Sequence, residues 1–167
     1  YQLLKEKFPQ LPAVKMHLHK AIPSGAGLGG GSADGAAALV LLNNKFNLGL
    51  TKEALIDLSL QLGSDCPFFI INKPCFASGR GEILEEITFS LSDYKIVIVN
   101  PGIHVNTGEA FSMVKPRSND SDKISLMNLT QLPVHLWKDA IANDFESVVF
   151  AQHPAIKEIK DELYSSG

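Results

Sequence analysis

The chain has 167 residues, of which 45% are hydrophobic and 20% are charged, a composition typical of one large globular domain or two small ones. Its formal net charge of −3 and its singly scattered Lys and Arg residues argue against the basic patches that bind nucleic acid or membrane surfaces. The longest apolar runs, such as residues 36–42, are far shorter than the roughly 20 residues that a membrane span requires.

Both ends of the chain carry helical patterns. Residues 1–8 have the pattern of a helix that is already under way. Residues 162–167 have the pattern of a helix that reaches its C-terminal cap, with Gly167 at a position where a left-handed cap is common. We therefore expect the chain to be a piece of a longer protein.

The first third of the chain predicts a strand, a glycine-rich loop and two helices. Residues 14–20 alternate apolar and polar side chains, which is the period of a half-buried strand. After the glycine-rich segment, residues 32–46 predict a buried helix. Thr51 is a plausible N-cap for a second helix that ends near Leu62.

The rest of the chain changes from short strands to helices. Residues 68–71 predict a short strand, and two more strands are expected on either side of the turn at 79–81. Residues 96–99 predict a buried strand, which a turn at 100–102 ends. A domain boundary is expected near 88–93. The other predicted elements are a short helix after Thr107, an exposed loop over 116–123, and helices over about 133–150 and 153–164.

Five glycines lie within residues 25–31, between the predicted strand and the predicted helix. Glycine inside a helix costs about 1 kcal/mol, so this density does not serve packing. It does let the backbone approach a ligand, with the N–H groups of the next helix pointing at an anion. The segment therefore predicts a phosphate-binding loop rather than a flexible connector.

Three common phosphate loops do not fit this sequence. No Lys follows the glycines, so the segment is not a Walker loop. Gly25, Gly27 and Gly30 satisfy the GxGxxG spacing, but the predicted helix leads to a second helix instead of the strand of a dinucleotide fold. The chain also lacks the HRD triplet of protein kinases.

Residues 20–34 resemble the nucleotide-binding motif of the GHMP kinases, and in detail that of the diphosphocytidyl-methylerythritol kinases. Ala33 stands where these enzymes usually carry a second serine. The resemblance implies that the segment grips the phosphates of ATP, with Ser32 as the best candidate for a hydroxyl near them. The ATP-binding residues expected on this basis are Pro23, Ser24, Gly25, Ala26, Gly27, Leu28, Gly29, Gly30, Gly31 and Ser32.

Residues 63–69 resemble the segment of the same family whose aspartate is regarded as the catalytic base, which implies this role for Asp65. The neighbouring residues are compatible with this role of Asp65. Asp65 lies in a tight turn beside Cys, Pro and two Phe residues, where partial desolvation would poise its carboxylate to accept a proton. The alternative is an aspartate that only satisfies backbone N–H groups of the turn.

Three further segments extend the resemblance over nearly the whole chain. Residues 77–84 resemble the xGRGExL hairpin of the family, residues 100–107 its PGxxVST segment, and residues 143–146 its NDLE helix, which we interpret as structural. The resemblance places Thr107 and Phe111 near the substrate, and implies Thr107 as a substrate-binding residue beside Asp65. A helix N-cap and a core residue are equally good interpretations of these two.

The resemblance implies an α+β fold with two incomplete domains. Residues 1–90 would be part of a ribosomal-S5-like, ATP-binding domain, and residues 91–167 part of a ferredoxin-like domain. The implied reaction is phosphorylation of the 2-hydroxyl of 4-diphosphocytidyl-2-C-methylerythritol by ATP with Mg²⁺, in non-mevalonate isoprenoid synthesis. A catalytic lysine and a Ser-Gly-Ser-Gly loop would lie outside this chain, so we expect the chain alone to be nearly inactive.

Two other functions remain open at this point. Another GHMP kinase, such as a mevalonate or homoserine kinase, would share the glycine loop, and so would a non-catalytic nucleotide- or anion-binding module that does not need Asp65. His17 and His19 share one face of the predicted strand but have no third metal ligand nearby. Cys66 and Cys75 show no metal-ligand spacing, which favours a reducing cytoplasm.

Overall fold

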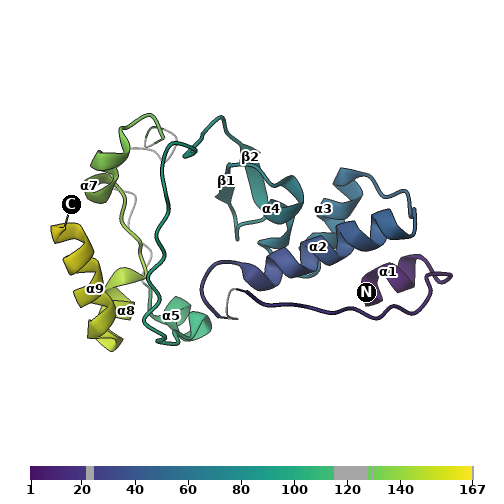
Figure 1. Ribbon diagram of the computed structural model, residues 1–167, viewed down its shortest axis with the longest axis horizontal. Helices are drawn as coiled ribbons and strands as arrows, with labels where there is room; N and C mark the ends of the chain where they lie inside the picture. The colour runs from purple at the N-terminus through teal and green to yellow at the C-terminus, as the bar shows by residue number, and fades with distance from the viewer. Residues whose placement is uncertain (22–24, 115–127, 129, 167) are drawn as a thin grey trace. The chain divides into compact units, whose positions relative to one another are not determined.

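The computed structural model describes residues 1–21, 25–114, 128 and 130–166. The chain forms two compact units, Tyr1–Asp93 and Tyr94–Gly167, and each is described here by itself (Figure 1). The division falls at the end of the 88–93 segment in which the sequence predicts a boundary. The assignment of the two units to the two kinase domains stays a prediction.

In its described residues, the first unit consists of helices and one β-hairpin. The helix predicted over 32–46 is confirmed as α2, the one after Thr51 as α3, and the two strands around 79–81 as β1 and β2, which pair in antiparallel register from Cys75–Glu86 to Ser78–Ile83. The elements are α1 (Gln2–Lys7), α2 (Gly30–Lys45), α3 (Lys52–Leu60), α4 (Cys66–Ile71), β1 (Cys75–Ser78) and β2 (Ile83–Glu86).

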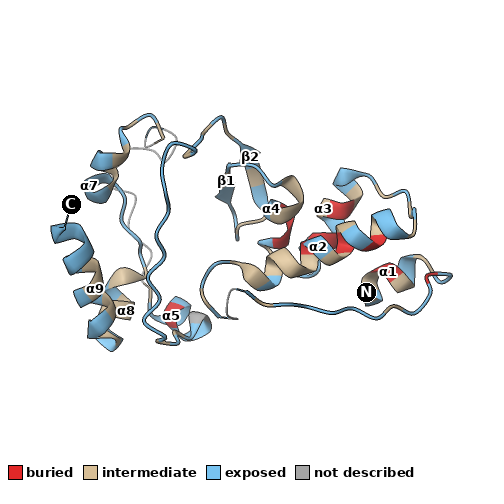
Figure 2. Cartoon of the chain, viewed as in Figure 1, coloured by how far each residue is buried: buried red, intermediate tan, exposed pale blue. Residues whose placement is uncertain are grey.

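A leucine core holds the helices of this unit together. Figure 2 shows buried residues on all four helices. Buried leucines come from α1, α2 and α3, and from the residues just after α1, so the apolar side of α3 faces the core. The members of the core are Leu4, Leu11, Leu39, Leu42, Leu55 and Leu58.

Local hydrogen bonds fix the turn between α2 and α3. Thr51 is the N-cap of α3, as predicted, and its hydroxyl accepts a hydrogen bond from the Ala54 N–H at 3.2 Å. The Asn43 side chain, which lies near the end of α2, bonds both the N–H and the carbonyl of Leu50, at 3.0 and 3.2 Å. These contacts set the direction in which α3 returns along α2.

The second unit is helical in its described residues. Asn106 begins the first helix, because its side-chain oxygen accepts from the Glu109 N–H at 3.2 Å. The elements are α5 (Thr107–Met113), the 3-10 helix η1 (Val134–Leu136), α7 (Trp137–Ala140), α8 (Glu146–Gln152) and α9 (Pro154–Ser165), and α9 confirms the helix predicted over 153–164. The loop predicted over 116–123 lies outside the described residues.

Two predicted strands are absent from the part of the chain that the structure describes. Residues 14–20 are extended but pair with no neighbouring strand there, and Met16 and Leu18 are exposed along a groove beside α2. Residues 96–99 are likewise unpaired, and Val97 is 83% exposed where the sequence predicts burial. The alternating pattern of 14–20 and the apolar pattern of 96–99 show only that their side chains are suited to a strand. A strand also needs the backbone of a neighbouring segment to pair with.

Two further predictions of local structure are wrong. Residues 68–71 belong to α4, not to a strand, because Pro67 occupies the first turn and the left-handed Asn72 ends the helix. The single helix predicted over 133–150 is divided into η1, α7 and α8, with no helix over 141–145. Asn143 contributes to this break, since its side chain accepts from the Phe145 N–H at 3.0 Å.

The segment 143–146 anchors α8 in the second unit, in agreement with its predicted structural role. The Lys160 ammonium donates to both oxygens of Glu146, at 2.6 and 2.7 Å, and so joins α9 to α8. The ring of Phe145 packs edge-on against Phe111 with centroids 4.7 Å apart. No helix among the described residues has the length and apolar character needed to cross a bilayer.

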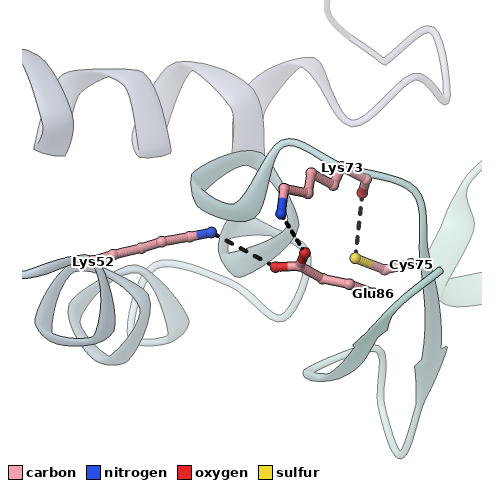
Figure 3. Close-up of polar contacts among 4 residues, drawn as sticks. All are labelled: Lys52, Lys73, Cys75 and Glu86. Atoms are coloured by element: carbon pink, nitrogen blue, oxygen red, sulfur yellow. Dashed lines mark hydrogen bonds and ion pairs between the residues drawn. The ribbon is translucent and has the colours of Figure 1, made fainter. Parts of the chain in front are cut away.

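A polar cluster ties the hairpin of the first unit to its helices (Figure 3). The Glu86 carboxylate, at the end of β2, accepts from Lys73 at 2.6 Å and lies 3.7 Å from the ammonium of Lys52 at the start of α3. The hydrogen bond from Lys73 holds the pKa of Glu86 below its ordinary value. Burial raises the pKa of the Cys75 thiol, which donates to the Lys73 carbonyl at 3.3 Å.

Removing the charge of Glu86 should weaken this tie. Since the folded protein lowers the pKa of Glu86 from 4.5, the tie contributes fully above that pH and is lost as the pH falls through the lower, folded value. We expect Glu86→Gln to lower the urea midpoint at neutral pH and to reduce its decline in acid. Urea unfolding between about pH 7 and about pH 3 measures both effects.

Glu85→Gln is the matched control, because alternation along β2 turns the Glu85 side chain to the other face of the hairpin. Superimposable acid profiles of wild type and Glu86→Gln would contradict the prediction.

Candidate active site

The glycine loop has an alternating backbone conformation. Gly25, Gly27 and Gly29 have φ values of +80°, +73° and +66°. The residues between them, Ala26 and Leu28, are not among the positive-φ positions of the described chain, so the sign of φ changes at each step. Such alternation turns successive N–H groups toward one side and forms an anion-binding concavity. The binding of phosphate by this loop stays a prediction.

Helix α2 begins directly after this loop. Its N-cap is Gly29, which has no side chain to accept a hydrogen bond, so the amides of the first turn keep no partner inside the helix. The positive end of the 16-residue helix therefore lies directly after the loop. Ser32 is half-buried in this first turn. The predicted site residues Pro23 and Ser24 lie outside the described residues.

An ion pair joins the segment before the loop to the helix after it. The Lys20 ammonium lies 2.5 Å from the Asp34 carboxylate, with side chains that are 27% and 34% exposed. The same ammonium lies 3.4 Å from the point where a Cβ at Gly30 would be. Residues 20 and 34 are thus held together at the base of the loop, and the lysine lies over the start of α2.

Asp65 lies in the turn between α3 and α4 and is exposed. The partial desolvation predicted for it is therefore wrong for the described residues. Asp65 occupies the N-cap position of α4, but its side chain accepts no capping hydrogen bond. A hydrogen bond from the Ser64 hydroxyl, at 3.5 Å, reaches Oδ1. The alternative of an aspartate that caps the turn is not what the structure shows, and the carboxylate is accessible to a ligand.

Helix α4 packs against α2 at positions where α2 has glycine. The buried Cys66, next to Asp65, lies 3.9 Å from the Cβ position of Gly35 and 3.7 Å from that of Gly63. One turn later, the Phe69 ring lies 2.9 Å from the Cβ position of Gly29. The residue after Asp65 and the last residue of the glycine loop are therefore in the same interface.

The tip of the hairpin lies beside Asp65. A Cβ at Gly81 would be 3.5 Å from Oδ1 of Asp65. At this tip the Arg80 N–H donates to Glu82 at 2.6 Å, and the pKa of Glu82 is lowered by hydrogen bonds from its own backbone N–H and from that of Arg80. The xGRGE-like turn, the Asp65 turn and the glycine loop thus belong to one region of the first unit.

The remaining predicted site residue, Thr107, is the first residue of α5 in the second unit, and the N-cap of that helix is its neighbour Asn106. The N-cap interpretation of Thr107 is therefore wrong, whereas its predicted role in substrate binding stays a prediction. Among the described residues no group of three His, Cys, Asp or Glu side chains is arranged to hold a metal ion. His17 and His19 are both exposed.

The contacts of Lys20, Asp34 and Phe69 were not predicted from the sequence. Lys20 and Asp34 are the first and last residues of the 20–34 motif, and their 14-residue separation hides the pairing. Phe69 stands in the segment that predicts a strand, where its helical position relative to Asp65 is not visible. Spacing of four residues on a helix would have placed both on one face.

Comparisons with known proteins identify similar sequences and one similar structure. Residues 1–73 match the family described as GHMP kinases N terminal domain. The chain is 52% identical over all of its 167 residues to a 4-diphosphocytidyl-2-C-methyl-D-erythritol kinase of Bacteroides fragilis, of which it covers 60%. It is 43% identical to the protein of the same name from Cytophaga hutchinsonii, of which it covers 61%.

A solved structure is similar over nearly the whole chain. The crystal structure of a 4-(cytidine 5'-diphospho)-2C-methyl-D-erythritol kinase matches with a TM-score of 0.75 and 27% identity, over 98% of this chain and 59% of that one. The expected fold class is therefore confirmed, in a form that is incomplete relative to the solved chain. The chain spans about 60% of the length of the curated relatives that it matches.

The Lys20–Asp34 pair yields a test of how the loop is held. We expect a double-mutant cycle of Lys20→Met and Asp34→Asn to give a coupling of up to about 1 kcal/mol, the upper range for a pair that is partly exposed. The coupling should decrease in high salt, which screens such charges. Urea unfolding of the four proteins measures it.

The exposed pair Lys157–Asp161 on α9 is the control, since it joins residues within one helix. Its expected coupling is about 0.3–0.5 kcal/mol. Additive effects at Lys20 and Asp34 would show that the pair does not hold the loop.

Proposed function

We propose that this chain, whose residues 1–73 match the GHMP kinase N-terminal domain, is part of a kinase that transfers the γ-phosphoryl group of ATP to an alcohol. The observation that carries the proposal is the placement of an accessible carboxylate, Asp65, on a helix that packs against the end of the glycine loop. Phosphoryl transfer needs an anion-binding loop and a proton acceptor in one place. The first unit contains candidates for both.

In this proposal the glycine loop binds the phosphates of ATP. The alternating φ signs from Gly25 to Gly29 and the free amides at the start of α2 supply hydrogen-bond donors without any side chain. Glycine is required at Gly27 and Gly29 because other residues rarely adopt a positive φ. Lys20 adds a positive charge close to Gly30, where it would attract the same phosphates.

Asp65 is the proposed general base. It accepts the proton of the substrate hydroxyl while the hydroxyl oxygen bonds to the γ-phosphorus, and the bond from that phosphorus to the bridging oxygen of ADP breaks. Because Asp65 is exposed in the described chain, the bound substrate would exclude water from it. Its freedom from capping hydrogen bonds leaves the carboxylate available for this role.

The proposed acceptor is the 2-hydroxyl of 4-diphosphocytidyl-2-C-methyl-D-erythritol. Its support is the name shared by the relatives from Bacteroides fragilis and Cytophaga hutchinsonii and the likeness to the solved kinase. Thr107 is a proposed contact of this substrate. The cytoplasm is the proposed location of the protein. Mg²⁺ would accompany ATP, held mainly by the phosphates and water.

Replacing Asp65 tests both the reaction and the base. In the protein of the relatives' full length, we expect Asp65→Asn to lower kcat by about 10²–10⁴-fold, because the substrate hydroxyl loses its proton acceptor. The KM for ATP should change little, since the loop is intact. Phosphoryl transfer from ATP to 4-diphosphocytidyl-2-C-methyl-D-erythritol is the measurement.

Asp57→Asn is the matched control, because Asp57 is an exposed carboxylate of the same unit on α3. Its activity should stay at the wild-type level. Turnover of mevalonate or homoserine instead would identify another GHMP kinase, and ATP binding without turnover of any alcohol would indicate a binding module.

A further inference from the structure

Gly29 and Phe69 approach more closely than a side chain at position 29 would allow. A Cβ at Gly29 would lie 2.9 Å from Cζ and 3.2 Å from Cε2 of the Phe69 ring. Gly29 is also the N-cap of α2, with φ of +66°. The last residue of the glycine loop is therefore in direct contact with an aromatic ring of α4.

Gly27 has the same backbone conformation without this contact. Its φ is +73°, and a Cβ there would meet nothing within 4 Å. Of these two glycines, only Gly29, at which the loop becomes helix α2, lies against the ring. A comparison of Gly27 with Gly29 therefore separates two effects of a substitution: the cost of a positive φ, and the clash with the ring.

Phe69 is restrained on its own side of the contact. It is half-buried, and its ring meets the edge of Phe68 with centroids 5.2 Å apart and planes at 78°. It lies four residues after Asp65, which is one helical turn, so the two positions share a face of α4. The buried Cys66 fixes the start of the same helix against Gly35.

We propose that Phe69 is a positioning residue that sets the separation between the glycine loop and Asp65 through the contact of its ring with Gly29. The proposal rests on the function proposed above and assigns to Phe69 a role that it exerts through its contact with the loop. Transfer requires reacting atoms within about 3–3.5 Å, and a misplacement of about 1 Å can cost about 10²-fold in rate. A rigid ring that links the end of the loop to the helix that follows Asp65 is suited to hold such a distance.

A double-mutant cycle of Phe69→Leu and Gly29→Ala tests the contact. Gly29→Ala alone should lower kcat/KM for ATP roughly 100-fold, because it adds overpacking against the ring to the cost of a positive φ. Phe69→Leu alone should lower kcat roughly tenfold with little change in the KM of the alcohol. In the Phe69→Leu background, Gly29→Ala should cost only roughly tenfold, because the overpacking is gone.

Gly27→Ala is the matched control, since it carries the cost of a positive φ alone. It should lower kcat/KM roughly tenfold whether residue 69 is Phe or Leu. The assays use the protein of the relatives' full length, at a temperature where circular dichroism shows every variant folded. Additive effects of Phe69→Leu and Gly29→Ala on kcat/KM, or a coupling equally large with Gly27→Ala, would overturn the proposal.

The outcomes separate this proposal from the proposed function. If the wild-type protein transfers no phosphoryl group, the proposed function fails, and the same cycle measured by urea unfolding still shows whether ring and loop are coupled. If wild type is active and the coupling appears in stability but not in kcat/KM, Phe69 is only a structural residue and the positioning role is wrong.

Discussion

Helices α2 and α4 approach each other at glycines, where the missing Cβ atoms leave room for Cys66 and Phe69 of α4. Helix α2 begins directly after the glycine loop, and α4 begins directly after Asp65. The two groups that we propose for phosphoryl transfer therefore lie at the starts of two helices in contact, and the leucine core joins α2 to α1 and α3. Larger residues at Gly29 or Gly35 would alter the site without touching any ligand.

The sequence predicts those elements whose cause is local. Thr51 caps α3 with its own hydroxyl, and residues 79–81 place a turn between two short strands, so both appear as expected. The strand predicted over 96–99 does not form among the described residues, because pairing depends on another segment and not on the four side chains. The strand predicted over 68–71 is wrong for a different reason, because a run of four apolar residues is compatible with a helix as well as with a strand.

In the candidate site, too, the features with a local cause are predictable and those that depend on packing are not. The glycine loop is predictable because positive φ values select glycine at a specific spacing. The exposure of Asp65 is not predictable from its apolar neighbours, since Cys66 turns toward α2 while the carboxylate faces solvent. Contacts across the fold, such as Lys20 with Asp34, are set by how the helices pack, which a single sequence does not reveal.

The exposed segment 96–99 has a consequence for the behaviour of the chain in solution. It presents Ile96, Val97, Ile98 and Val99 to water, in an extended backbone that pairs with no strand among the described residues. Such a stretch is a template for edge-to-edge strand addition between molecules. In this 167-residue form, self-association through 96–99 would compete with the monomer as concentration rises, and a charged substitution such as Val97→Lys would act as a gatekeeper against it.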